Sequence, residues 1–283
     1  MLAPSTHFTS SFLFLSKAAI ETVLVVGSTG NIGVSAVTAA LRSKRNVLAI
    51  VRNQNSADKL VKHVGTSEGI NFAEANVASE TGVKSVVAQV RAGRLPAFQH
   101  VWSSDSLSCS TCKLMLASNT AFQSAASTST PLCRRSPTSK YATTSSSASK
   151  PISISLFDLR ASSVPSTQVR AVVYRETIGY LLEQKNPAST WTICTGSQGD
   201  LATFPVPAMT QGALFSMCIA AAREDEKTNV RFNEILLGFR VEVDENAKEH
   251  EVTAASVFAQ MYESVLANPN VRSSRVRVDE VVV

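Results

Sequence analysis

The chain has few of the residues on which metal centres and disulfide frameworks depend. Its 283 residues include four histidines and five cysteines. An odd number of cysteines favours a reducing compartment over a disulfide framework. Cys109 and Cys112 have the CxxC spacing, but no second pair and no nearby histidine completes a zinc site. We therefore expect no bound metal and a cytoplasmic location.

Long apolar runs and a concentrated basic surface are also missing. No apolar run approaches the ~20 residues that span a bilayer. Residues 1–21 lack the basic start of a secretory signal and the arginines of a mitochondrial one, so we expect a disordered leader. The net charge is +5. Ser103 to Val173 carries seven basic and two acidic residues, which leaves 20 of each sign elsewhere. We expect neither a membrane nor a nucleic-acid partner.

Short apolar runs alternate with helical patterns in the first hundred residues. The runs are four to six residues long, and the helical segments repeat their apolar residues at the spacing of one helix face. This alternation predicts βαβ units, and hence an α/β fold with a doubly wound parallel sheet of the Rossmann type. Strands are predicted at Thr22–Val26, Asn46–Val51, Ile70–Ala73 and Phe98–Trp102. Helices are predicted at Asn31–Ser43 and at Glu80–Ala92. A further helix is predicted between them, with Ser56 as its N-cap.

A serine-rich stretch interrupts this pattern. Of the 64 residues from Ser103 to Ser166, 20 are serine and seven are threonine. Such a composition buries too little apolar surface to offset chain entropy. We therefore predict a single domain over residues 22–283, interrupted by an irregular insert at about 105–173. Regular elements are predicted to resume at Tyr174–Gln184, Thr190–Cys194, Met209–Arg223, Val230–Val243, Thr253–Leu266 and Arg275–Val278.

A glycine-rich turn lies between the first strand and the first helix. It has the sequence Gly27-Ser28-Thr29-Gly30-Asn31-Ile32-Gly33. Strand, Gly-x-x-Gly-x-x-Gly and helix together form the context in which a backbone turn cradles a dinucleotide diphosphate. The first glycine permits the tight turn, the second a close approach to phosphate, and the third close packing of the helix. The sequence therefore predicts a dinucleotide site.

The end of the second predicted strand distinguishes the two nicotinamide dinucleotides. An acid there binds the ribose 2′-hydroxyl of NAD, whereas an arginine accommodates the 2′-phosphate of NADP. The chain has Arg52 and Asn53 at this position, and no acid before Asp58. We therefore expect NADP(H) in preference to NAD(H). Asn76 and Val77, after the third strand, are candidates for contact with the adenine.

These features resemble the short-chain dehydrogenase/reductase superfamily. The glycine spacing and the Val51-Arg52-Asn53 ending look like its atypical, NmrA-like branch. Thr192–Ser197 is similar to the family's fifth strand with its substrate-binding serine, here Ser197, and Gln211–Leu214 resembles the helix after the catalytic tyrosine. The resemblance implies an NADPH-dependent oxidoreductase of small carbonyl or alcohol substrates, usually a homo-oligomer.

The chain departs from the family at its proton donor. The tyrosine and lysine positions hold Pro207 and Gln211, and no Tyr-x-x-x-Lys occurs anywhere. Proline has no proton to give, and a neutral glutamine cannot lower the pKa of a tyrosine. His100 is a weaker candidate acid, at the end of the fourth strand. The alternative is therefore a catalytically dead dinucleotide-binding protein that senses redox state or regulates a partner. The abrupt composition of residues 105–173 also suggests a retained intron or a shifted reading frame.

Overall fold

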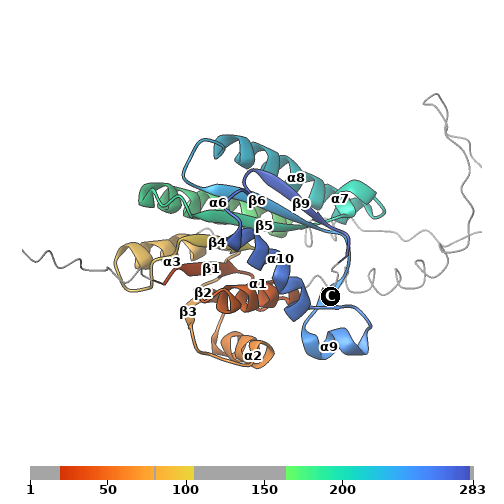
Figure 1. Cartoon of the computed structure of the whole chain (residues 1–283), viewed down its shortest axis with the longest axis horizontal. Helices are drawn as coiled ribbons and strands as arrows, with labels where there is room; N and C mark the ends of the chain where they lie inside the picture. Colours follow the sequence, from red (N-terminus) through yellow and green to blue (C-terminus); the bar gives the residue numbers. More distant parts are fainter. Residues whose placement is uncertain (1–19, 80, 105–163, 281–283) are drawn as a thin grey trace, which may run out of the picture.

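A seven-stranded, wholly parallel sheet forms the centre of the molecule, in the order β3-β2-β1-β4-β5-β6-β9. The computed structural model of the chain describes residues 20–79, 81–104 and 164–280 (Figure 1). The strands are β1 (Thr22–Val26), β2 (Asn46–Val51), β3 (Ile70–Glu74), β4 (His100–Ser103), β5 (Thr190–Gly196), β6 (Arg231–Leu237) and β9 (Ser274–Val278). The doubly wound fold predicted from the alternating pattern is confirmed.

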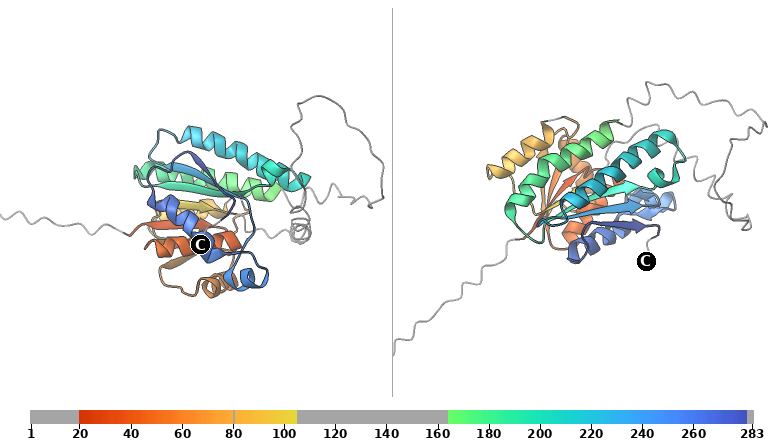
Figure 2. Two further views of the ribbon diagram at one scale, coloured as in Figure 1. Left: turned by 45° about the vertical axis from the view of Figure 1, so that its right-hand side comes forward. Right: turned by 90° about the horizontal axis from the view of Figure 1, so that it is seen from above.

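Helices cover both faces of this sheet (Figures 1 and 2). One face carries α1 (Asn31–Arg42), α2 (Gln54–Val64) and α10 (Ala255–Ala267). The other carries α3 (Gly82–Arg91), α6 (Val164–Gln184) and α8 (Pro205–Glu224). Smaller elements lie at the ends of strands: α7 (Gln198–Leu201), α9 (Asp244–Glu249), and the two-stranded sheet of β7 (Val241–Glu242) and β8 (Thr253–Ala254).

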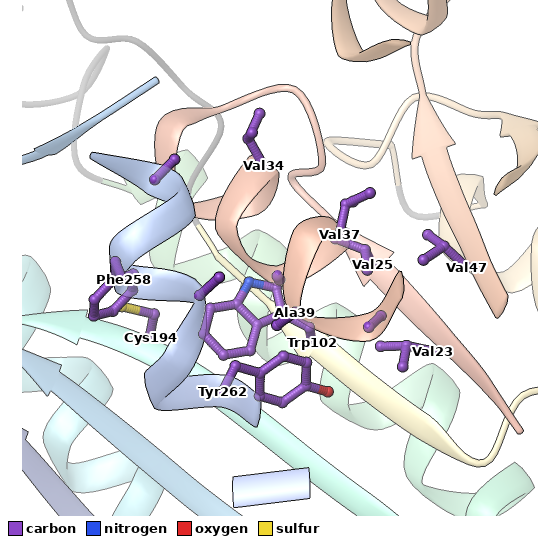
Figure 3. Packing of buried hydrophobic residues seen from close by; sticks show 14 of the residues in the cluster. Val23, Val25, Val34, Val37, Ala39, Val47, Trp102, Cys194, Phe258 and Tyr262 are labelled. Carbon is purple, nitrogen blue, oxygen red and sulfur yellow. The ribbon is translucent and has the colours of Figure 1, made fainter. Parts of the chain in front are cut away.

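Each face of the sheet has its own apolar core. On the α1 side, Trp102 packs against Tyr262 with the rings tilted and their centroids 4.4 Å apart, and valines from β1 and β2 fill the space beside them (Figure 3). On the α6 side, Trp191 and Phe232 lie parallel with centroids 5.2 Å apart. Both tryptophans are fully buried. Burial on both faces explains why these strands read as continuous apolar runs in the sequence.

Helix α6 corrects one predicted boundary. We expected helical structure from Tyr174, but the helix begins at Val164, so the last ten residues assigned to the insert are helical. Its buried stripe is Arg170, Val173, Thr177 and Leu181, a helical spacing in which two of the four residues are polar. Apolar periodicity underestimates such a helix. Residues 1–19 and 105–163, which include the predicted leader, most of the predicted insert and the Cys109/Cys112 pair, lie outside the described residues.

Other boundaries moved by only a few residues. Asn53, not Ser56, caps α2, because its side-chain oxygen accepts from the Ser56 amide at 3.0 Å. Among the described residues, α8 has the length and apolar composition of a membrane-spanning helix. Core helices of globular proteins share this composition, and α8 packs against α6, β5 and β6.

The two edge strands of the sheet carry polar and charged side chains. On β3, Asn71 and Glu74 are exposed. On β9, Arg275 and Arg277 alternate with more buried neighbours, and both are held by acids: Arg275 Nε lies 2.7 Å from Glu234, and Arg277 Nε lies 2.8 Å from Asp279. Both ends of the hydrogen-bonded sheet are therefore polar.

Candidate functional site

The site lies at the carboxyl edge of the sheet, where the strand order reverses. The chain proceeds outward from β1 to β2 and β3, then returns to β4 on the other side of β1. At such a switch point the two loops diverge and leave a crevice in which open α/β sheets bind their ligands. The turn after β1 and Ser104 after β4 face each other there, because Ser104 N donates to the Val26 carbonyl at 3.2 Å.

The glycine turn is shaped by contacts that exclude side chains. Gly27 has φ +83°, and a Cβ there would come within 2.5 Å of the Ser104 carbonyl oxygen. A Cβ on Gly33 would overlap the Gly27 carbonyl oxygen. The Ser28 hydroxyl is fully buried and donates to the Ile50 carbonyl at 2.9 Å, so it ties the turn to β2. Three positions are thus used to hold a bare backbone loop in one conformation.

The start of α1 is built to receive an anion. Gly30 is its N-cap and provides no side-chain acceptor for the helix. The amides of Asn31, Ile32 and Gly33 therefore have no side-chain cap in the part of the chain that the structure describes. The N-terminus of this twelve-residue helix carries the positive end of its dipole. Free amides and a positive dipole at a glycine turn fit a dinucleotide diphosphate.

Arg52 and Asn53 lie next to this turn, directly after β2. Arg52 is exposed and forms no ion pair within the described segments, so its guanidinium is available to a ligand. The Asn53 side chain is occupied, since its oxygen accepts from both the amide and the hydroxyl of Ser56. Of the two predicted specificity residues, Arg52 is thus the charged donor, while Asn53 has its side-chain oxygen committed to the cap of α2.

Asn76 and Val77 lie at the same edge, beyond β3. The Asn76 side-chain oxygen accepts from the Ala78 amide at 3.1 Å. Val77 is half-buried and packs against the α3 side of the core. The backbone of this loop lies close to α3, because a Cβ on Gly82 would overlap the Asn76 carbonyl oxygen. The predicted adenine contacts are therefore at the expected edge, with the Asn76 side chain folded back onto its own loop.

Ser197 and Gln211 come together at the end of β5. Ser197 directly follows the strand and bonds through its amide to the Leu237 carbonyl at 3.0 Å. Gln211 on α8 accepts from the Gly196 amide through its side-chain oxygen at 2.8 Å. Pro207 lies in the first turn of α8, where its missing N–H costs no helical bond. Nothing in the spacing of these residues along the chain predicts the contact between Gln211 and Gly196, which only the fold reveals.

His100 is at the wrong end of the sheet for catalysis. It begins β4 rather than ending it, and is fully buried. Its Nε2 lies 3.1 Å from Glu21 Oε2, and its Nδ1 lies 3.0 Å from Thr190 Oγ1. Burial lowers the pKa of His100. The hydrogen bond to His100, aided by Arg45, lowers the pKa of Glu21 to about 2. His100 is therefore a structural residue at the amino ends of the strands.

Fold and turn together define a dinucleotide-binding α/β protein of the Rossmann type. No family profile matches the chain. It is 44% identical over 261 residues to the short-chain dehydrogenase/reductase iacG of Pestalotiopsis fici, with 90% of each chain covered. The chain belongs to the short-chain dehydrogenase/reductase superfamily, and is an oxidoreductase of that family by descent. Membership implies an NAD(P) cofactor, and the bare turn and free amides fit its diphosphate.

Solved structures show the same fold at low sequence identity. A glucose/ribitol dehydrogenase-type member from Brucella melitensis has a TM-score of 0.63 at 15% identity, covering 93% of this chain and 97% of that one. The citronellol catabolism dehydrogenase AtuB of Pseudomonas aeruginosa has a TM-score of 0.60 at 16% identity, covering 91% and 92%. At these identities the likeness supports the fold alone.

Proposed function

We propose that this protein binds NADP(H) and acts as an NADPH-dependent oxidoreductase on small carbonyl or alcohol compounds. The observation that carries the proposal is the pairing of a bare diphosphate cradle at Gly27–Gly33 with the exposed guanidinium of Arg52, which no described residue engages, directly after the neighbouring strand. The guanidinium fork matches phosphate oxygens, which supports the 2′-phosphate of NADP as its ligand.

The residues of the site divide the work of binding and orientation. A bound nicotinamide cofactor supplies or accepts the hydride. The amides of Asn31, Ile32 and Gly33 hold the diphosphate, and Arg52 holds the 2′-phosphate. The Ser197 hydroxyl donates a hydrogen bond to the carbonyl oxygen of the substrate. Gln211 keeps this serine in place, because it fixes the amide of the preceding glycine. In the described residues of this site no side chain is an acid, so the proton of the product comes from water.

The lack of an acid among the described side chains of the site favours a second function, that of a dinucleotide-binding regulator without catalysis. Pro207 and Gln211 occupy the positions of the family's tyrosine and lysine, and the Gln211 carboxamide is already bonded to Gly196. The two described cysteines do not suit thiol sensing. Burial raises the pKa of Cys194 to about 12, and burial also raises that of Cys218. Such a regulator would therefore respond to the dinucleotide itself.

Two measurements on the full chain separate these functions. Both predict that NADPH raises the melting temperature, because a ligand that binds only the folded state stabilises it. The oxidoreductase also oxidises NADPH when offered a panel of small aldehydes and ketones, and Ser197→Ala lowers this rate without changing NADPH affinity. NADPH binding with no oxidation by any of the panel identifies the regulator. No binding of either dinucleotide contradicts both functions.

We also propose that the protein self-associates through α8. Its outer side exposes Met209 and Ile219 at 54% and 49%. Met209 and Ile219 are two of the four large apolar side chains that are exposed among the described residues, and both lie on this one helix. The partner is a second copy of the chain.

A further inference from the structure

Arg170 is a buried cation that forms no ion pair with any residue that the structure describes. It lies on α6, facing the sheet, and only 4% of its surface is exposed. In residues 20–79, 81–104 and 164–280, no acceptor is bonded to its Nε or Nη1, and no acid forms an ion pair with it. A guanidinium does not lose its proton inside a protein. A buried charge of this kind is costly unless an anion pairs with it.

The position of Arg170 follows from the packing of α6. Thr177 on this helix accepts from Trp191 Nε1 of β5 at 2.9 Å. Helices in this fold run antiparallel to the strands. Arg170, which is seven residues before Thr177 on α6, therefore lies about 10 Å nearer the carboxyl edge of the sheet. Strand residues rise about 3.3 Å each, which places Arg170 at the level of Cys194. This level is beneath Ser197. Burial raises the pKa of the Cys194 thiol, and the nearby charge of Arg170 opposes this effect.

A second unpartnered polar atom lies on the same face and near the same level. Ser103 is fully buried at the end of β4, and its hydroxyl has no hydrogen-bond partner among the described residues. It follows Val101 by two residues, so both point to the face that α6 covers. β4 and β5 are neighbours, with Ser103 paired to Ile193. A hydroxyl donor and a guanidinium thus share one region under α6.

The charges of this region call for one more negative group. Among the described residues, Glu234 of β6 is the buried acid there, and its oxygens accept hydrogen bonds from Thr195 at 2.6 Å and Arg275 at 2.7 Å. Arg170 and Arg275 contribute two positive charges against the one of Glu234. The net charge of these three side chains is therefore positive by one. A bound monocarboxylate would bring it to zero, whereas a phosphate dianion would make it negative. A planar carboxylate also suits the guanidinium geometry.

We infer that Arg170 binds the carboxylate of a small organic acid beneath the carboxyl edge of the sheet. The site rests on Arg170 and Ser103, neither of which is part of the cofactor cradle. Where the oxidoreductase proposed above holds, this acid is its substrate or product, an oxo acid or a hydroxy acid. The acid-binding site itself does not depend on that function.

The test uses acetate and its neutral analogue acetamide on the full chain, without cofactor and at constant ionic strength in chloride. Acetate at about ten times its dissociation constant is expected to raise the melting temperature by about 3–6 °C. Acetamide is expected to leave it unchanged. Equal melting temperatures in acetate and acetamide overturn the inference.

Variants separate binding from a structural role. Arg170→Met is expected to lose the acetate effect and, in chloride, to melt at or above the wild-type temperature, because it removes an unpaired buried charge. Arg175→Met, an exposed position on the same helix, is the control and keeps the acetate effect. A lower melting temperature of Arg170→Met in chloride, with the acetate effect unchanged, contradicts the inference. Should Arg170→Met not fold, the inference depends on the acetate and acetamide comparison in the wild type.

A carboxylate from the chain itself is the competing occupant. Asp105 and Asp158 lie outside the described residues. If wild type ignores acetate while a double Asp105→Asn, Asp158→Asn variant is stabilised by it, the chain supplies its own anion and the ligand site is refuted. Failure of the proposed function looks different, since acetate would still stabilise a protein that neither binds nor oxidises NADPH.

Discussion

Replacing Arg52 by aspartate is expected to reverse the choice between the two nicotinamide dinucleotides. The side chain is exposed after β2, next to the diphosphate cradle, and has no partner to lose among the described residues. A hydrogen bond to a charged group contributes about 1.5–3 kcal/mol. Its loss therefore weakens NADPH binding about 10- to 150-fold.

The aspartate adds two effects of opposite sign. Its charge repels the 2′-phosphate of NADPH, whereas its oxygens can accept the 2′-hydroxyl of NADH. The ratio of the two dissociation constants should therefore change by more than about 100-fold, most of it from NADPH. Calorimetric titration of both dinucleotides at physiological salt measures this ratio.

A matched charge change elsewhere serves as the control. Arg94 is exposed after α3, remote from the carboxyl edge, so Arg94→Asp makes the same change in net charge. It is expected to leave both dissociation constants within about twofold, because salt screens distant surface charges. Equal weakening of NADPH and NADH by Arg52→Asp would refute the role of Arg52 as the 2′-phosphate ligand.

Three further predictions concern the cradle, the amino ends of the strands, and α8. Gly33→Ala is expected to lower the free energy of unfolding by about 1–3 kcal/mol and to abolish NADPH binding. Gly179→Ala, where a Cβ meets open space, is the control and is expected to keep wild-type stability and NADPH binding; calorimetry measures both quantities. Because the pKa of Glu21 is lowered, its ionised carboxylate stabilises the fold fully at pH values above the ordinary pKa of 4.5. This stabilisation is lost as the pH falls toward 2. Denaturant titrations should therefore show a steeper acid decline for wild type than for Glu21→Gln, and parallel curves would argue against it. Met209→Glu with Ile219→Glu is expected to shift sedimentation toward the monomer, and an unchanged oligomer would exclude α8 as the contact.

The sheet and the cradle were predictable because their signals are local. Thr22–Val26 is an apolar, β-branched run that stops at a glycine, and the strand was found at these residues. Gly27 and Gly33 are required by the conformation and close packing of the turn, and their spacing is visible directly in the sequence. Arg52 could be placed for the same reason, since it directly follows a buried strand.

Features that depend on distant partners were not visible in the sequence. His100 seemed a candidate acid because its strand was predicted to begin two residues too early, and its true partner, Glu21, is 79 residues away. The first turns of α6, residues 164–173, were missed because Arg170 interrupts the apolar stripe there. In the sequence, Gln211 is notable only for occupying the position of the family's lysine. The fold shows that its side chain also accepts a hydrogen bond from the amide of Gly196 at the end of β5. Residues 164–173, which lie in the segment attributed above to a retained intron or a shifted reading frame, form the first turns of α6, so that hypothesis now concerns residues 105–163; a spliced transcript that encodes these residues would refute it.

The polar edges of the sheet limit how this protein can assemble. A strand added at β9 would have to bury the charges of Arg275 and Arg277, and one added at β3 would have to cover Glu74. Charged edge positions discourage strand-by-strand growth of that kind. In the described part of the chain the sheet edges therefore disfavour growth by added strands, which leaves a helix face, proposed above to be that of α8, as the route for contact between copies.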